Sequence, residues 1–355
     1  PFWMQLQPYL MFSTDGPMDI KFRNARNPGD VEIGHLVTNN MGFRMVEPVR
    51  FDVRRPKAQG ERVVLFTGGS AAWGAGATSN DTTIAARMQA ILNEAQPTHR
   101  YVVISLSSVS WISIQSVLAI TLYGLNFDPD WVVGMDGYND FGDACFYGAG
   151  RDRMSYVFDK YFRGYLYHQP SPTFYRGAWE NELVRVSAAY RMLTGQRYVP
   201  EPPQLTAKWG ELERALTFYE LAYDRLFRVL SASKAKMLVS TQPHLSLYKA
   251  DFGAGPDRLQ EIAARHADAE CRKVPYIESH RYFFPRLKQV SQDLVARWKD
   301  KLDIRYLNMT ELVPEDADTR RSMRWGPTDD IHLTDRGNDF VAHIYARTIL
   351  DADGR

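Results

Sequence analysis

Three residues of the chain are of the types that nucleophilic catalysis by a serine requires. Ser70 stands directly after Gly68-Gly69 and before a helical pattern, so its backbone N–H is free to face a developing oxyanion. His332 has the side chain whose ordinary pKa suits a general base near neutrality. Asp329, three residues earlier, can fix the tautomer of that imidazole if the loop between them folds back on itself. Together they predict attack of a serine hydroxyl on an acyl carbonyl.

Asn139 adds a candidate donor for the oxyanion that such an attack creates. It lies in Asp136-Gly137-Tyr138-Asn139-Asp140, and its amide N–H₂ is neutral and has no proton to lose. Each motif also has a structural alternative. An asparagine beside glycine is common in turns, Gly-Gly-Ser commonly opens a helix, and the acidic loop before the last helix can serve as its cap, through Thr334 or Asp335.

The elements that must position these residues are indicated by short apolar runs that alternate with helical patterns. Such runs are typical of parallel strands buried on both faces, and functional groups gather where those strands end. Two further strand-like pieces, 31–38 and 50–54, precede them. The runs cover 62–66, 101–105, 130–135, 236–240 and 304–308, and the helical patterns cover about 82–94, 113–123, 211–231, 287–300 and 335–350.

The motifs in this order resemble the SGNH hydrolase superfamily, the GDSL esterases and lipases. The blocks are Gly-Gly-Ser70, Gly137-x-Asn139-Asp140 and Asp329-x-x-His332-Leu-Thr-x-x-Gly337, within roughly 60–150 and 235–350. The resemblance implies a flavodoxin-like three-layer α/β/α fold with a five-stranded parallel sheet. It also implies Ser70 as nucleophile, His332 as base, Asp329 as orienting acid, and Asn139 with the Ser70 N–H as oxyanion donors.

Two positions depart from the family pattern. Gly69 replaces an aspartate, which we expect to be tolerated because that residue makes no bond in the reaction. The second block usually supplies a glycine whose N–H joins the oxyanion hole. The corresponding residue here is Ser110, with Ser107 as the alternative. A backbone N–H survives either replacement, provided that the backbone conformation suits a side chain.

The expected organisation is an N-terminal extension over 1–60 that packs on the core, then a hydrolase domain over 61–350 with an insertion at about 148–210. The first half of the insertion is rich in aromatic residues, which either pack onto the domain or form a lid or platform for a sugar chain or acyl group. The candidate substrate-binding residues are Trp73, Tyr138, Tyr165 and Trp179.

Composition limits the partners and the redox chemistry. Lys and Arg number 43 against 42 Asp and Glu, so no bulk field recruits nucleic acid or an anionic membrane. Cys145 and Cys271 lie far apart and outside any CxxC spacing, so the sequence predicts two free thiols, with one disulfide as the alternative. We expect no metal, no cofactor and a monomer.

The start of the chain bears on location. Because translation does not begin at proline, Pro1 indicates that some upstream sequence has been removed, and any signal or anchor with it. The apolar segment 1–12 suits a stretch just beyond a membrane anchor, or a segment that lies on the domain. The segment 39–44 resembles that of membrane-anchored SGNH proteins of bacterial envelopes. A periplasmic or extracellular location is expected, with a cytoplasmic one as the alternative.

The substrate expected from these features is an acylated polysaccharide or another ester. The leading hypothesis is a carbohydrate esterase that removes acetyl groups from a glycan. The alternatives are an O-acetyltransferase that modifies an extracellular polysaccharide, a lipase or thioesterase, and a non-catalytic glycan-binding module.

Overall fold

The centre of the protein is a five-stranded parallel sheet with strand order β6-β5-β7-β8-β9. The structure is a computed structural model, and it describes residues 4–7, 9–14, 16–23, 33–45, 57–147, 187–194, 208–209, 212–253 and 255–354. This strand order is the flavodoxin-like one and confirms the predicted fold class. The strands are β5 (Glu61–Gly68), β6 (Arg100–Ser107), β7 (Trp131–Asp136), β8 (Lys236–Thr241) and β9 (Ile304–Asn308).

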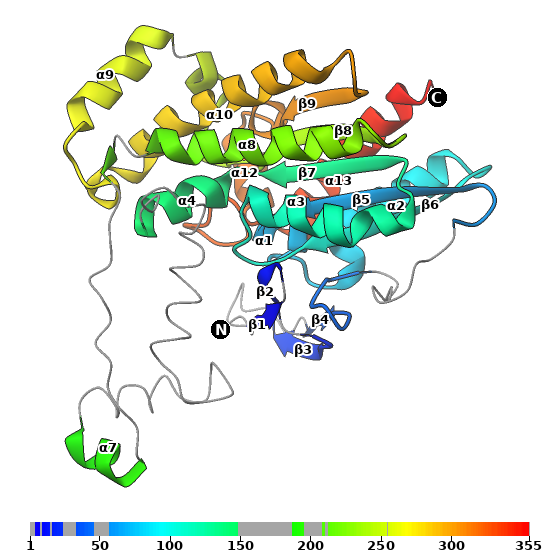
Figure 1. The fold of residues 1–355 in the computed structure, drawn as a ribbon, viewed down its shortest axis with the longest axis horizontal. Helices are drawn as coiled ribbons and strands as arrows, with labels where there is room; N and C mark the ends of the chain where they lie inside the picture. The colour runs from blue at the N-terminus through cyan, green and yellow to red at the C-terminus, as the bar shows by residue number, and fades with distance from the viewer. Residues whose placement is uncertain are drawn as a thin grey trace.

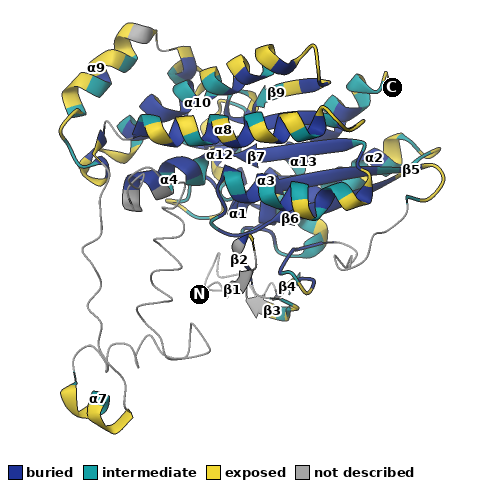
Figure 2. Ribbon diagram, viewed as in Figure 1, coloured by how far each residue is buried: buried dark blue, intermediate teal, exposed yellow. Residues whose placement is uncertain are grey.

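Helices cover both faces of this sheet, which makes three layers (Figure 1). Side chains of β5 alternate between the faces: Val63 and Leu65 pack with α3, α8 and α10, whereas Val64 and Phe66 pack with α2 and α13. In Figure 2 strands β5, β7 and β8 are buried along nearly all of their length, the edge strand β9 is partly exposed, and the helices show exposed residues on their outer sides. The covering helices are α2 (Ile84–Ala95), α3 (Ser113–Leu122), α8 (Leu212–Leu230), α10 (Tyr276–Trp298) and α13 (Asp335–Ala352).

The predicted strands and helices match the observed ones closely, except at α10. This helix begins at Tyr276, well before the predicted 287, and runs through Pro285. A proline inside a helix normally breaks or kinks it. Here Phe283, Phe284 and Leu287 around it are fully buried, so packing outweighs that cost. The predicted strand at 50–54 lies outside the described residues.

The N-terminal residues form two antiparallel strand pairs that contact the core. The Thr14 N–H donates to Ser108 Oγ at 2.7 Å, and Gln115 Nε2 donates to the Leu10 carbonyl at 3.0 Å. Within the described residues, no helix is long and apolar enough to cross a bilayer. The pairs are β1 (Met4–Gln7) with β2 (Met11–Thr14), and β3 (Asp19–Arg23) with β4 (Ile33–Val37).

Short helices complete the described part of the chain. They are α1 (Ser70–Trp73), η1 (Asn80–Thr82), η2 (Gly124–Phe127), α4 (Tyr138–Tyr147), α7 (Ala188–Thr194), η5 (Lys249–Gly253), α9 (Pro256–His266), η6 (Cys271–Lys273), α11 (Met309–Leu312) and α12 (Ala317–Met323). Two of them, α1 and α4, carry Ser70 and Asn139.

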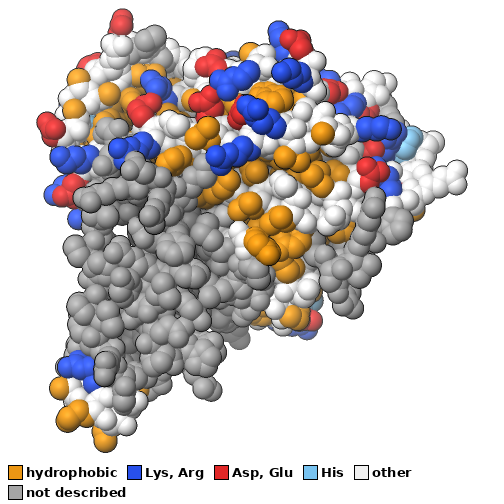
Figure 3. Space-filling model, in the orientation of Figure 1, with side chains coloured by type: hydrophobic (Ala, Val, Ile, Leu, Met, Phe, Trp, Pro, Cys, Tyr) orange, Lys and Arg blue, Asp and Glu red, His pale blue; other side chains and the backbone are white. Residues whose placement is uncertain are grey.

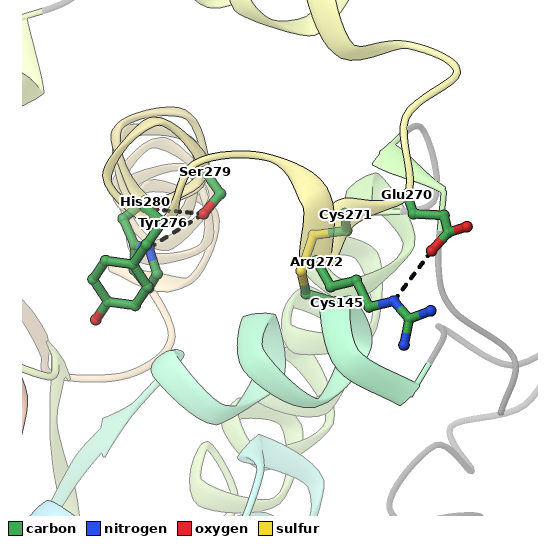
Figure 4. The surroundings of a disulfide bond; sticks show 7 residues. All are labelled: Cys145, Glu270, Cys271, Arg272, Tyr276, Ser279 and His280. Atoms are coloured by element: carbon green, nitrogen blue, oxygen red, sulfur yellow. Dashed lines mark hydrogen bonds and ion pairs between the residues drawn. A yellow bond between two sulfur atoms is a disulfide. The ribbon is translucent and has the colours of Figure 1, made fainter.

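The prediction of two free thiols is wrong. Cys145 in α4 and Cys271 in η6 form a disulfide, with their Cα atoms 5.2 Å apart (Figure 4). The two cysteines are 126 residues apart, so no local spacing connects them. Only the packing of η6 against α4 reveals the pair.

Candidate active site

The nucleophile candidate lies at the carboxyl edge of the sheet, where β5 ends and α1 begins. Ser70 is the first residue of α1, and its side chain is buried. The preceding turn requires Gly68, because its φ is +153° and a Cβ there would lie 2.3 Å from the Met135 carbonyl oxygen. As the first residue of a helix, Ser70 has a backbone N–H with no intrahelical acceptor. That N–H is therefore available to an oxyanion.

The structure brings the three catalytic candidates together. Ser70 Oγ lies 2.7 Å from His332 Nε2, across 262 residues of sequence. His332 Nδ1 lies 2.7 Å from Asp329 Oδ2. The side chains of His332 and Asp329 are both 20% exposed, so a substrate can reach the base. The distances place a hydroxyl, an imidazole and a carboxylate in one hydrogen-bonded chain.

The chemistry of the partners determines the tautomer of His332. An ionised carboxylate only accepts hydrogen bonds, so Nδ1 must carry the proton that it donates to Asp329. In the neutral ring Nε2 is then left as an acceptor, and the Ser70 hydroxyl donates to it. This is the arrangement in which an imidazole can take the proton of a serine during attack.

Asp329 is held by its own loop. Its Oδ1 accepts from the backbone N–H groups of His332 at 2.9 Å and Ile331 at 3.1 Å. Burial acts to raise the pKa of Asp329, but the hydrogen bond and charge of His332 and these two N–H donors outweigh it. The pKa of Asp329 therefore lies below its ordinary value, and the carboxylate stays ionised at neutral pH. The next helix is capped separately, by Thr334 Oγ1, which accepts from the Gly337 N–H.

Asn139 lies beside the nucleophile turn. It is in the first turn of α4, directly after β7, and its Nδ2 donates to the Trp111 carbonyl at 2.8 Å. A Cβ on Gly69 would lie only 2.4 Å from Asn139 Nδ2. Glycine therefore fits at position 69, because the Asn139 amide occupies the space that a side chain would need.

Ser110 and Ser107 occupy different environments. Ser107 ends β6, and its hydroxyl lies 2.6 Å from that of Ser105. Ser110 lies in a turn closed by the Trp111 N–H donating to the Ser108 carbonyl, and its φ is +61°. This left-handed conformation favours glycine. Ser110 therefore has a backbone conformation that glycine would adopt without strain.

The N-terminal motif 39–44 clamps the nucleophile helix. Arg44 is buried and donates to the carbonyls of Gly74 at 2.5 Å and Ala77 at 3.3 Å. Burial lowers the pKa of Arg44 to about 10, although the charge of Asp335 acts to raise it. The sequence offered no reason to assign this residue to the site. Through these two hydrogen bonds, Arg44 fixes the turn that follows α1.

Trp73, predicted to bind substrate, is instead part of this clamp. Its side chain is only 3% exposed, and its Nε1 donates to the Gly42 carbonyl at 3.2 Å. The guanidinium of Arg44 lies over its ring, 5.5 Å from the ring centre. The buried indole therefore holds α1 in place rather than facing a ligand. Two other predicted substrate contacts, Tyr165 and Trp179, lie outside the described residues.

Tyr138, the fourth predicted contact, is partly buried next to a tyrosine that the sequence did not single out. The hydroxyls of Tyr138 and Tyr276 lie 3.5 Å apart, and the Tyr276 side of α10 also carries His280 (Figure 4). The pKa of Tyr276 is raised above its ordinary value, mainly by burial. The neighbouring Tyr138 and then the charges of Asp330 and Asp329 raise it further. Tyr276 therefore lies within electrostatic reach of the acid of the proposed triad.

No known family model matches this chain, and no curated protein is similar to it. Among solved structures it is similar to a GDSL-like lipase from Bacteroides thetaiotaomicron, with 12% identity and a TM-score of 0.39 over 82% of this chain and 89% of that one. It is also similar to an acetyl xylan esterase, with 15% identity and a TM-score of 0.42 over 81% and 99% of the two chains.

A third similar structure is a two-domain esterase active on acetylated mannans. The identity is 12% and the TM-score 0.44, over 84% of this chain and 51% of that one. This chain thus spans about half the length of that esterase. At these identities and TM-scores, no activity is carried over to this chain.

Proposed function

We propose that the protein is a serine esterase of the SGNH type that removes small acyl groups, such as acetyl, from a glycan. The observation that carries this proposal is the hydrogen-bonded chain from Ser70 through His332 to Asp329, with 2.7 Å at each step. Its position supports the proposal too. In a sheet of this strand order, ligands bind at the carboxyl ends of the two strands flanking the switch in strand order, here β5 and β7.

The first step forms an acyl-enzyme. Ser70 Oγ attacks the ester carbonyl carbon while its proton passes to His332 Nε2. The carbonyl oxygen becomes an oxyanion, held by the N–H groups of Ser70 and Ser110 and the amide of Asn139. Such donors are worth about 3–4 kcal/mol each where one has been removed. The intermediate then collapses, the alcohol leaves with the proton from His332, and the acyl group remains on Ser70.

The second step regenerates the enzyme. Water gives a proton to His332 Nε2 and attacks the acyl carbonyl carbon, and the same donors hold the second oxyanion. The bond to Ser70 Oγ breaks, the proton returns to Oγ, and a carboxylic acid is released. Asp329 keeps the imidazole oriented and stabilises its charged form in both steps.

A periplasmic or extracellular location is part of the proposal. The Cys145–Cys271 disulfide supports it, because disulfides persist mainly in oxidising compartments.

The test is hydrolysis of p-nitrophenyl acetate by the wild type and by Ser70→Ala. We expect kcat/KM to fall by at least about 10³-fold, since only the nucleophile is lost. A covalent serine probe should label the wild type at Ser70 and leave the variant unlabelled. The control is Ser231→Ala, which removes an exposed hydroxyl at the end of α8 and should change neither result.

Retention of activity in Ser70→Ala, or labelling at another serine, would remove Ser70 as nucleophile. If an oligosaccharide acceptor captured most of the acyl group in preference to water, the protein would be an acyltransferase and not a hydrolase.

A further inference from the structure

A cleft of about 590 Å³ opens beside the loop that carries the proposed base. It lies between the loop after β8, helix α12 and the segment that follows α12. The described residues lining it are Leu245, Tyr248, Ala317, Arg320, Arg321, Arg324, Trp325, Gly326 and Pro327.

The charge of this lining is one-sided. Three of the described lining residues are arginines, and none of them is Asp or Glu. On the surface over α8 and α10, basic and acidic side chains are interspersed (Figure 3), as in the pair of Arg228 and Asp224. In the cleft, the carboxylate partners of Arg321 and Arg324 lie outside the lining, so the charged side chains that line it are all basic.

The two inner arginines are held in place by the fold. Arg320 is buried, and its guanidinium donates to backbone carbonyls, including that of Leu247 at 2.6 Å. In the described part of the chain, no carboxylate lies within ion-pair distance of Arg320. Arg324 is paired with Asp330 at 2.8 Å, beside the orienting acid. These contacts occupy most of the N–H donors of both guanidinium groups, so Arg320 and Arg324 form a fixed wall of the cleft and leave direct contact with a ligand to Arg321.

Arg321 is the arginine that is free to reach a ligand. Its side chain is 78% exposed, and its partner Asp318, at 3.2 Å, is 92% exposed. Exposed ion pairs of this kind contribute little, so a carboxylate or sulfate on a substrate can replace Asp318 at small cost. Guanidinium groups suit such anions, because they donate two parallel hydrogen bonds.

Aromatic rings link the cleft to the base. Tyr248 is 38% exposed and Trp325 is 40% exposed, as expected of surfaces on which a sugar ring stacks. The Trp325 ring packs edge-on against that of His332, with 6.0 Å between ring centres, and the backbone N–H of Trp325 donates to the His332 carbonyl at 3.1 Å. A ligand in the cleft therefore lies next to the residue that takes the Ser70 proton.

We propose that this cleft is a subsite for a negatively charged sugar, so that the substrate is an acylated acidic glycan rather than a neutral one. The inference rests on the proposed esterase activity and names its substrate class. The anion is a carboxylate or a sulfate carried on the sugar, and the arginines recognise the charge that the two share. An ester on the neighbouring sugar would then be presented to Ser70.

The experiment measures acetate release from an acetylated polyuronate, and from the same polymer with its carboxyl groups converted to methyl esters. We expect kcat/KM to be at least about tenfold higher for the charged form, in line with the strength of hydrogen bonds to charged groups. Raising the salt concentration should reduce this preference, since screening weakens exposed charge pairs. An acetylated, sulfated neutral glycan forms a third arm, and a preference for it over the polyuronate would assign the anion as sulfate.

Arg321→Gln tests the assignment to the cleft. We expect the ratio of kcat/KM for the polyuronate to that for p-nitrophenyl acetate to fall about five- to tenfold. Arg347→Gln is the matched control, because Arg347 is also largely exposed and pairs with an exposed carboxylate, that of Asp351. It should leave both rates unchanged.

Equal rates on the charged and methylated polymers, or an unchanged ratio in Arg321→Gln, would overturn the subsite. Turnover of p-nitrophenyl acetate in the same preparations would show that the esterase activity survives that result. No turnover of any ester would instead overturn the proposed function.

Discussion

His332 lies near the carboxyl edge of the sheet, as do His280 and His244, and the surroundings of His332 differ sharply from those of the other two. His332 has a hydroxyl on one ring nitrogen and a carboxylate on the other, and its side chain is 20% exposed. His280 is 2% exposed and stacks against Phe284 at 5.6 Å, with Tyr138 on another side at 5.7 Å. Its Nδ1 donates to the Tyr276 carbonyl at 2.6 Å, and no partner for its Nε2 is found among the described residues.

The difference shows what turns a histidine into a candidate base. Burial lowers the pKa of His280 to about 4, although its backbone hydrogen bond acts to raise it, so the ring is neutral at physiological pH. The pKa of His244, whose ring centre is 4.8 Å from that of His280, is also lowered by burial and by nearby cations. Within the described part of the chain, neither ring is hydrogen-bonded to a carboxylate that could stabilise an imidazolium. We infer that these two act as packing groups, whereas His332 is placed to carry a proton.

The largest difference in activity should appear when His332 and His280 are replaced in separate variants. His332→Ala should lower kcat for p-nitrophenyl acetate by about 10⁴- to 10⁶-fold, because the base is lost. His280→Phe keeps an aromatic ring in the packed cluster and should change kcat by less than threefold. A severe loss of kcat in His280→Phe, with an intact fold by circular dichroism, would break the distinction between the two sites.

The pH dependence of stability sharpens the same comparison. Because the folded protein disfavours a charged His280, the unfolded chain takes up that proton first as the pH falls. The free energy of unfolding therefore has its full value above about pH 6.5 and falls progressively toward pH 4. The shift in the pKa of His280 accounts for a loss of about 3 kcal/mol. His280→Phe should remove this loss, as measured by urea unfolding at several pH values.

Another buried group titrates in the same range with the opposite sign. Burial raises the pKa of Asp136 to about 6, although hydrogen bonds from Tyr223 and Ser116 act to lower it. Its stabilising contribution is present in acid and lost as the pH rises past 6. Because the wild type and His280→Phe both contain Asp136, its contribution cancels in the difference between their stability curves. Parallel curves would contradict the assignment.

The smallest effect concerns the turn at Ser110. Ser110→Gly should stabilise the protein by up to about 1 kcal/mol, because glycine adopts a φ of +61° without strain. The gain is partly offset, because the unfolded chain gains conformational freedom at a glycine. The N–H proposed for the oxyanion hole is kept, so kcat should stay within twofold. Thermal unfolding and p-nitrophenyl acetate turnover measure the two quantities. A clear loss of kcat would mean that the Ser110 hydroxyl itself takes part.

The sequence was informative where chemistry sits next to a strand end. Ser70 and Asn139 directly follow apolar runs, so a parallel sheet was enough to bring these two residues to one edge. Asp329 and His332 lie three residues apart in one loop, so the sequence already placed them together. Tyr276 gave no such signal, because its neighbour Tyr138 is 138 residues away and a proline masked the start of its helix.

Contacts that depend on shape were equally invisible. The Asn139 amide fills the space beside Gly69, which no residue pattern records. Trp73 has the ring expected of a sugar platform, yet the N-terminal clamp buries it. Arg320 and Arg321 of the cleft come from α12 and Arg324 follows it directly, but the aromatic residue Tyr248 comes from the loop after β8. Such features emerge only when distant segments are packed together.

The bond between Cys145 and Cys271 has a consequence for the integrity of the chain. Any single cut of the backbone between these two positions leaves both pieces covalently joined. The N-terminal piece would still carry Ser70 and Asn139, and the C-terminal piece His332 and Asp329. A protein nicked in this span would therefore migrate as one species on a non-reducing gel and as two after reduction. The two halves of the proposed catalytic machinery would stay tethered to each other after the polypeptide itself had been severed.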